Sequence, residues 1–289
     1  MAGNMSAHAD GTVPPRIPNP ARRGFRGRLR QIRYRVDLAY YRLWRVAGGP
    51  AYLDEITFWE SILSQRPSSL FDRRVREAAF PPELRECAAE LQRIHLRLPR
   101  LLELGSGPVS ILAFGIDEGL FTIVAVDPLA RAYRHLLRLY GVTYPIQPVP
   151  GRGETLLKQF IPASFDIAYS SNALDHTRSP RRCLEQMCQV LRPGGFLVLE
   201  GFVREGTHGN WSGLHQHDLL TEHGSLTHLD RAGRHTNLTA DLPLTCVSER
   251  VCQFKDRGIE AFGYEASADM PPDPPWNYQD WYTLVLRRL

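Results

Sequence analysis

The sequence predicts an α/β fold built on a mostly parallel, doubly wound sheet with helices on both faces. Apolar runs typical of buried parallel strands recur along the chain, at 101–104, 122–126, 165–169 and 196–199. A segment with helical spacing, 130–140, follows the second run. Because parallel strands need a crossover that is usually a helix, this order favours a parallel sheet.

The first apolar run ends in a glycine-rich loop, Gly105-Ser106-Gly107, and Pro108 prevents the strand from continuing. Glycines let the backbone turn tightly and approach a ligand closely. In open α/β sheets, ligands bind outside the carboxyl ends of the strands, where the strand order reverses. The loop by itself fits either a nucleotide-type site or an ordinary strand-to-helix turn.

Polar residues at the ends of the later strands favour the ligand site. Asp127 ends the second strand about twenty residues after the glycines, the spacing at which dinucleotide folds place an acid on ribose hydroxyls. Ser170-Ser171-Asn172 closes the run 165–169, and the turn 192–195 leads into the strand 196–200. A carboxylate can accept from both ribose hydroxyls, so we expect these hydroxyls to be the only partners of Asp127.

Four motifs, in this order, carry a family resemblance: ELGSGP at 103–108, VDP at 126–128, FDIAYSSNALDH at 165–176 and LRPGGFLVLEG at 191–201. Together they resemble the class I S-adenosylmethionine-dependent methyltransferases, in particular the methyltransferase type 11 branch that includes the ubiquinone- and menaquinone-biosynthesis enzymes. The resemblance covers roughly residues 98–201, about a third of the chain. It implies a Rossmann-like sheet of seven mostly parallel strands with one antiparallel edge strand, S-adenosyl-L-methionine as the cofactor, and methyl transfer as the activity.

The resemblance also implies the cofactor contacts. Glu103 and the loop backbone would hold the aminoacyl end, Asp127 the ribose, and Asn172 would line the methyl-donor side. At the adenine end, the family's usual acid position holds Arg152, and Glu154 either takes over that contact or begins a helix. The full expected cofactor set is Glu103, Gly105, Ser106, Gly107, Asp127, Pro128, Gly153, Glu154, Asn172 and Ala173.

Three parts are expected along the chain: a disordered tail over 1–24, a helical cap over 25–96 and the methyltransferase domain over 97–289. The first cap helix, 25–46, is rich in arginine, and residues 1–50 carry ten Arg against two Asp, while the remainder of the chain is net negative. This helix either packs on the domain, or binds an anionic membrane surface or a partner, or acts as an RNA- or DNA-binding arm.

Further cap helices are expected at 54–66, 70–79 and 82–95. In enzymes of this resemblance, N-terminal helices often lie over the cofactor and form one wall of the acceptor pocket. The residues that could supply this wall here are aromatic, and core packing is the alternative role for each: Phe58, Trp59 and Phe71.

Composition excludes several classes of protein. No run of eighteen apolar residues exists, so no membrane span is expected, and the absence of an apolar signal-peptide core predicts a cytoplasmic protein. The five cysteines form no CxxC pair, which predicts reduced and mostly buried thiols. The sequence does not indicate an oligomeric state.

After Gly201 the family pattern fades, and six of the ten histidines fall between 208 and 235. We expect 203–243 to be an acceptor-side insertion that acts as a lid, with a hairpin at 225–238. An H-x-H pair on a strand, His215 and His217, would suit Zn or Fe, but no zinc spacing is present and no metal site is expected. The sheet would be completed by strands at 246–254, 258–264 and 281–286, the last of them the reversed edge strand, with a proline-rich loop at 270–276.

A hydroxyl acceptor needs a base, and histidine has a suitable pKa. His176 lies just after Asn172, although the pair Asp175-His176 also fits a structural role at a helix start. His215 and His217 are the other candidate bases; the expected catalytic residues are His215 and His176.

The preferred hypothesis for function is O-methylation of a small-molecule acceptor, a sugar-like or natural-product hydroxyl. The alternative is an acceptor in RNA or at an anionic membrane, to which the arginine-rich helix would recruit the domain. A third reading is a cofactor-binding protein without catalysis.

Overall fold

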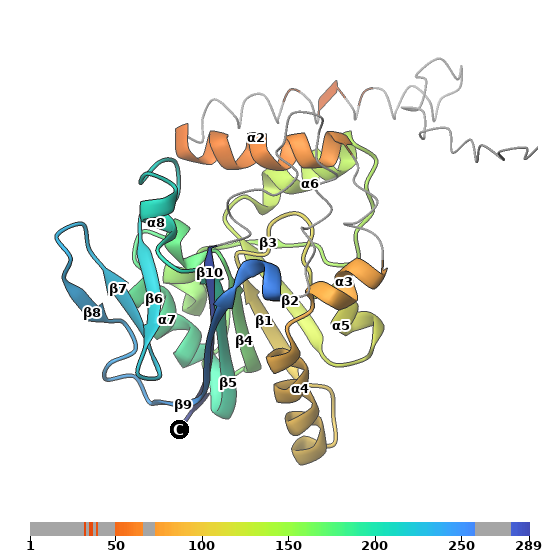
Figure 1. The fold of residues 1–289 in the computed structure, drawn as a ribbon. Helices are drawn as coiled ribbons and strands as arrows, with labels where there is room; N and C mark the ends of the chain where they lie inside the picture. Colours follow the sequence, from red (N-terminus) through yellow and green to blue (C-terminus); the bar gives the residue numbers. More distant parts are fainter. Residues whose placement is uncertain (1–31, 33–34, 37–38, 40–49, 66–72, 258–278) are drawn as a thin grey trace, which may run out of the picture.

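The computed structural model describes residues 32, 35–36, 39, 50–65, 73–257 and 279–289, and within them a seven-stranded sheet forms the centre of the molecule (Figure 1). The strand order is β3-β2-β1-β4-β5-β10-β9. All neighbours from β3 to β5 are parallel, whereas β10 is antiparallel to both β5 and β9. The doubly wound, mostly parallel fold is therefore confirmed. The reversing strand is β10, as expected, and β9 lies outside it at the edge. The strands are β1 Arg100–Leu104, β2 Thr122–Asp127, β3 Val149–Pro150, β4 Phe165–Ser171, β5 Leu191–Phe202, β9 Leu244–Gln253 and β10 Asp280–Arg288.

Four of the helices, α2, α3, α4 and α6, lie within about four residues of the positions that the sequence predicts. Pro82 occupies the first turn of α4, where its missing N–H is not needed, and Leu96 ends that helix in the left-handed conformation. Ser179 caps α7 by accepting the N–H of Arg182. The helices are α2 Pro50–Gln65, α3 Arg73–Ala79, α4 Pro82–His95, α5 Ala113–Asp117, α6 Ala130–Leu139, η2 Gly153–Lys158, η3 Leu174–His176, α7 Pro180–Val190, α8 Glu205–His208 and η4 Phe254–Arg257.

Strand side chains alternate between two hydrophobic cores, one on each face of the sheet. On β1, Leu101 packs into one core, whereas Leu102 and Leu104 pack into the other. The first core is closed by α2, α4, α5 and α6, and the second by η2 and α7. This double burial explains why the strands are nearly continuous apolar runs in the sequence.

A second, three-stranded antiparallel sheet follows β5, in the order β6 Asp218–Glu222, β7 Ser225–Leu229 and β8 His235–Asn237. The hairpin expected at 225–238 is confirmed by the pairing of β7 with β8. This small sheet lies beside α7 and packs its leucines into the second core (Figure 1).

Several expected elements lie outside the described residues: the tail 1–24, nearly all of the arginine-rich helix 25–46, Phe71, the strand 258–264 and the loop 270–276. In the part of the chain that the structure describes, no helix combines the length and the apolar content that crossing a bilayer requires. All five cysteines are free thiols, three of them buried, while Cys246 is exposed and Cys252 is half-buried.

Candidate functional site

The glycine loop lies where the strand order of the large sheet reverses. β1 pairs with β2 on one side and with β4 on the other, so the loops that follow β1 and β4 diverge and leave a crevice between them. Gly105 and Gly107 both adopt positive φ angles, +75° and +61°. A Cβ atom at Gly105 would lie 2.2 Å from the Cβ of Ala173, so only glycine fits where the loops after β1 and β4 meet.

Glu103 presents a buried carboxylate oxygen that has no hydrogen-bond partner among the residues that the structure describes. Its Oε1 accepts a hydrogen bond from Ser110 Oγ at 2.7 Å, while its buried Oε2 has none. Burial raises the pKa of Glu103 to about 8, because the hydrogen bond from Ser110 offsets only part of the desolvation and the charge of Asp127 adds to it. An unpaired buried acceptor is costly, so its presence beside the glycine loop indicates a site for a donor or a cation.

Asp127 is also buried, but the expectation that ribose hydroxyls are its only partners is wrong. Its carboxylate accepts the backbone N–H groups of Gly107 at 3.1 Å and Leu129 at 2.7 Å, and so it ties the loop after β1 to the start of α6. Burial raises its pKa to about 7, although these two bonds oppose the shift. Each carboxylate oxygen can accept a second hydrogen bond, so ribose donors still fit.

These features fit the adenosyl cofactor that the sequence motifs imply. The glycine loop leaves room for close backbone approach, Glu103 offers an orphan acceptor, and Asp127 offers spare lone pairs. Asn172, at a φ of +43°, accepts the N–H of Phe202 and lines the same space. At the other end, Glu154 accepts the N–H of Arg178 from within η2.

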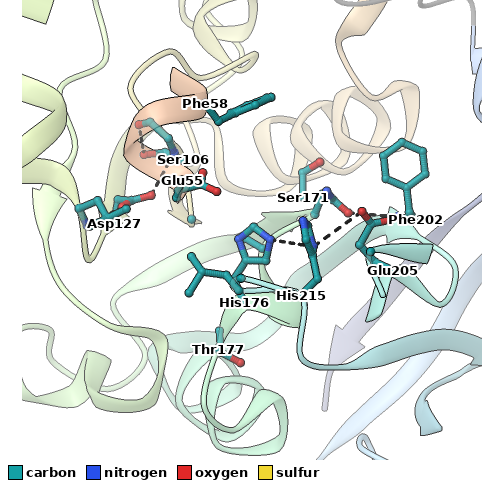
Figure 2. A pocket seen from close by; sticks show the side chains of 18 of the residues that line it. Glu55, Phe58, Ser106, Asp127, Ser171, His176, Thr177, Phe202, Glu205 and His215 are labelled. Atoms are coloured by element: carbon teal, nitrogen blue, oxygen red, sulfur yellow. Dashed lines mark hydrogen bonds and ion pairs between the residues drawn. The ribbon is translucent and has the colours of Figure 1, made fainter. Parts of the chain in front are cut away.

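One cavity of about 1430 Å³ contains all of the expected cofactor residues and both expected catalytic histidines. Their roles stay predictions, but the structure brings every one of them together. In Figure 2, Ser106 and Asp127 lie toward one end of the cavity, and His176, His215 and Glu205 lie toward the other. Helix α2 lies across this space and contributes Glu55, Phe58 and Trp59 to its wall, whereas Ile56 and Leu63 on the same helix are buried in the core.

A compact polar cluster lies next to the end of β4. Asp175 Oδ2 is 2.9 Å from His215 Nδ1 and 3.4 Å from His176 Nε2, and the two histidine nitrogens are 3.1 Å apart. Burial lowers the pKa of His215, but the hydrogen bond with Asp175 and its charge outweigh burial and raise that pKa above its ordinary value. Burial also raises the pKa of Asp175, yet the two histidines reverse the shift, so its pKa is lowered.

His217 does not share this cluster, and the idea of an H-x-H strand pair is wrong. β6 begins only at Asp218, so neither His215 nor His217 lies on a strand. His217 instead contacts the carbonyl of Thr177 at 2.9 Å and His228 at 3.3 Å, away from His215. The side chains of 215 and 217 therefore diverge and cannot share a ligand.

Four acidic residues of the cavity were missed by sequence reasoning, Asp54, Glu55, Glu205 and Asp280, and two of them make contacts that bear on the site. Glu205, in α8, has its Oε1 3.7 Å from His215 Nδ1, and its Oε2 is buried with no partner among residues 50–65, 73–257 and 279–289. Burial raises the pKa of Glu205 to about 7, the charge of His215 opposes the shift, and Asp175 and Asp218 add to it. Glu55 reaches the cavity from α2 and accepts a hydrogen bond from Trp59 Nε1. The only sequence signal for Glu205 was its position just after the strand that ends near 202.

The central segment of the chain matches a known protein family. Residues 102–199 match the family model described as a methyltransferase domain. Two curated relatives are each called tRNA U34 carboxymethyltransferase. The protein from Hahella chejuensis is 33% identical over 93 residues, which cover 32% of this chain and 28% of the relative. That from Saccharophagus degradans is 32% identical over 120 residues, covering 39% of this chain and 35% of the relative.

The chain therefore spans about a third of the length of the curated relatives that it matches. Among solved structures, the 1,6-didemethyltoxoflavin-N1-methyltransferase of Burkholderia thailandensis, with bound S-adenosylhomocysteine, superposes with a TM-score of 0.39 and 17% identity. That superposition covers 83% of this chain and 90% of the other.

Proposed function

We propose that this chain, whose residues 102–199 form a class I S-adenosylmethionine-dependent methyltransferase domain, transfers a methyl group to a hydroxyl of a small polar acceptor. The observation that carries this proposal is the cluster of Asp175, His176 and His215, whose two histidines line the same cavity as the expected cofactor residues. A neutral hydroxyl is a weak nucleophile, so a base at this position has a clear use.

Asp175 positions His215 for this role. The 2.9 Å contact orients Nδ1–H of His215 toward the carboxylate and leaves the lone pair on Nε2, as an acid does for histidine in hydrolase triads. When bound, the cofactor supplies a methyl group on a positively charged sulfur. His215 Nε2 would take the proton of the acceptor hydroxyl as that oxygen becomes a nucleophile. The remaining task of the chain is to hold the acceptor in line and to exclude water.

The charge of the cavity favours a small acceptor over a polyanion. Three arginines line it, and seven acids do: Arg152, Arg178 and Arg204 against Asp54, Glu55, Glu103, Asp127, Glu154, Glu205 and Asp280. Burial raises the pKa values of Glu103, Asp127 and Glu205, so these three carry only part of a charge near neutral pH, but the other four acids still outnumber the arginines. Proteins that bind RNA through its phosphates do so with lysine and arginine. An acid-rich cavity instead suits neutral polar groups that donate hydrogen bonds, as the hydroxyls of a sugar-like molecule do.

Helix α2 and the segment 203–243 are proposed as the two covers of the acceptor. Asp54 of α2 faces Gly213, where a Cβ would lie 3.5 Å from the Asp54 carboxylate. Residues of both elements line the cavity, so these covers would limit its access to solvent.

The proposal is tested with labelled cofactor, a panel of hydroxylated small molecules, and three variants. We expect His215→Ala to lower the turnover about a hundredfold to ten-thousandfold while cofactor affinity, measured by calorimetry, stays near wild type. His217→Ala, outside the cavity lining, is the matched control and should retain turnover. Full turnover in both His215→Ala and His176→Ala would show that no base is used. The acceptor group would then be an amine or a carboxylate and not a hydroxyl.

A second candidate is an RNA acceptor, which the names of the curated relatives favour. The ten arginines within residues 1–50 could supply the contacts to phosphate that the cavity lacks. Unfractionated tRNA in the same assay separates the two candidates. Transfer to tRNA that falls steeply with salt, with none to small molecules, would favour RNA and overturn the small-molecule proposal.

A further inference from the structure

The cluster of Asp175, His176 and His215 contains a conflict in its hydrogen bonding. Each of the three facing atoms, Asp175 Oδ2, His176 Nε2 and His215 Nδ1, lies within 3.4 Å of the other two. An imidazole nitrogen carries at most one proton. With Asp175 ionised, every assignment of protons leaves one contact that joins either two donors or two acceptors.

A metal ion removes this conflict, because all three atoms can then direct lone pairs at one centre. A triangle with edges of 2.9, 3.1 and 3.4 Å has a circumradius of about 1.8 Å. A point about 2.0–2.1 Å from all three atoms, the usual zinc–ligand distance, therefore exists about 1 Å off their plane. Two imidazoles and one carboxylate are a donor set that suits a divalent transition metal.

The surroundings of the cluster also suit a cation. Asp175 is buried, and the side chains of both histidines are mostly buried, at 20% and 31% exposure. Glu205 places Oε1 3.7 Å from His215 Nδ1, and within the described part of the chain its Oε2 has no hydrogen-bond partner. The histidines and Glu205 line the large cavity, so the open coordination positions would face the acceptor (Figure 2).

We propose that Asp175, His176 and His215 form a binding site for a divalent transition-metal ion such as Zn²⁺. This site goes beyond the proposed function and does not depend on it. With the ion bound, the two imidazoles act as ligands, and activation of an acceptor hydroxyl passes from His215 to the ion. The acceptor class proposed above remains the same.

Cobalt(II) is the probe for this site, because its visible absorption reports the ligands and geometry. The full chain is stripped with a chelator, titrated with Co²⁺, and then challenged with Zn²⁺. We expect one equivalent of Co²⁺ to bind, with ligand-field bands of a four- or five-coordinate ion that Zn²⁺ removes. His215→Gln and Asp175→Asn should each weaken binding by at least about a hundredfold.

His217→Gln is the matched control, because His217 lies nearby but contacts Thr177 and His228 instead. It should bind Co²⁺ as the wild type does, and titration with S-adenosylhomocysteine shows that each variant is folded. Absent binding in the wild type, or binding that His215→Gln leaves unchanged, would overturn the metal site. Full methyl transfer by the stripped protein together with absent Co²⁺ binding would overturn the metal site and leave the proposed function. Binding of one Co²⁺ ion without methyl transfer to any hydroxyl would support the metal site and overturn the proposed function.

Discussion

Glu103 provides a prediction that links stability to cofactor binding. Its carboxyl is buried, and its pKa is raised to about 8 from an ordinary value of 4.5. A group with a raised pKa in the folded state stabilises the fold fully only below its unfolded pKa, and this contribution is lost as the pH rises toward the folded pKa. From pH 4.5 to pH 7 is roughly 2.5 pH units, and each unit is equivalent to about 1.36 kcal/mol. The unfolding free energy therefore falls by up to about 3 kcal/mol over this range.

Glu103→Gln removes this titration while keeping the size of the side chain. We therefore expect the unfolding free energy of the cofactor-free wild type to fall between pH 5 and pH 7.5, relative to Glu103→Gln, by about 2–3 kcal/mol. Urea denaturation at both pH values measures the difference. The same variant should bind S-adenosylhomocysteine about tenfold to a hundredfold more weakly, because a charge-assisted hydrogen bond is worth about 1.5–3 kcal/mol.

The matched control is Glu86→Gln, at an exposed position on α4. It should change neither the pH dependence of unfolding nor the affinity for S-adenosylhomocysteine. Parallel stability curves for wild type and Glu103→Gln, combined with equal affinities, would refute the reasoning. That result would mean that water or a neighbouring group already satisfies the buried oxygen.

Three further predictions concern the same framework. Gly105→Ala should abolish cofactor binding, because the new Cβ would lie 2.2 Å from the Cβ of Ala173. Adding Ala173→Gly to this variant should restore part of the binding, and calorimetry of both variants shows whether the clash is the cause. Asp127→Ala should lower the melting temperature as well as cofactor affinity, because two backbone N–H groups lose their acceptor at about 1–3 kcal/mol each; an unchanged melting temperature would contradict this. Burial raises the pKa of Asp166, but hydrogen bonds from Arg97, the N–H of residue 100 and Arg192 outweigh burial and lower that pKa to about 2. The wild type should therefore be about 2 kcal/mol more stable than Asp166→Asn above pH 4, and this difference should disappear toward pH 2. An acid titration of both proteins, followed by circular dichroism, measures it.

The sequence by itself determined the parts of this protein that depend on interactions between residues close together in the chain. Buried strands are apolar on both faces, so the sequence alone predicts strands from the apolar runs 101–104 and 196–199. It predicts the reversing strand near 281–286 in the same way. A turn that needs positive φ and close backbone approach selects glycine, which marked the loop after β1. These signals located the side of the site where the cofactor is expected, because its groups follow directly from strand ends.

The tertiary structure alone decided the histidine side of the cavity. The sequence placed His215 and His217 as neighbours, yet their side chains reach different partners, because no strand there aligns them. Asp175 and His215 are forty residues apart and meet only because the segment after β5 folds back over the end of β4. Glu205 becomes a buried acid through the same packing. Contacts between distant segments depend on how whole elements pack, and no local pattern of residues records that information.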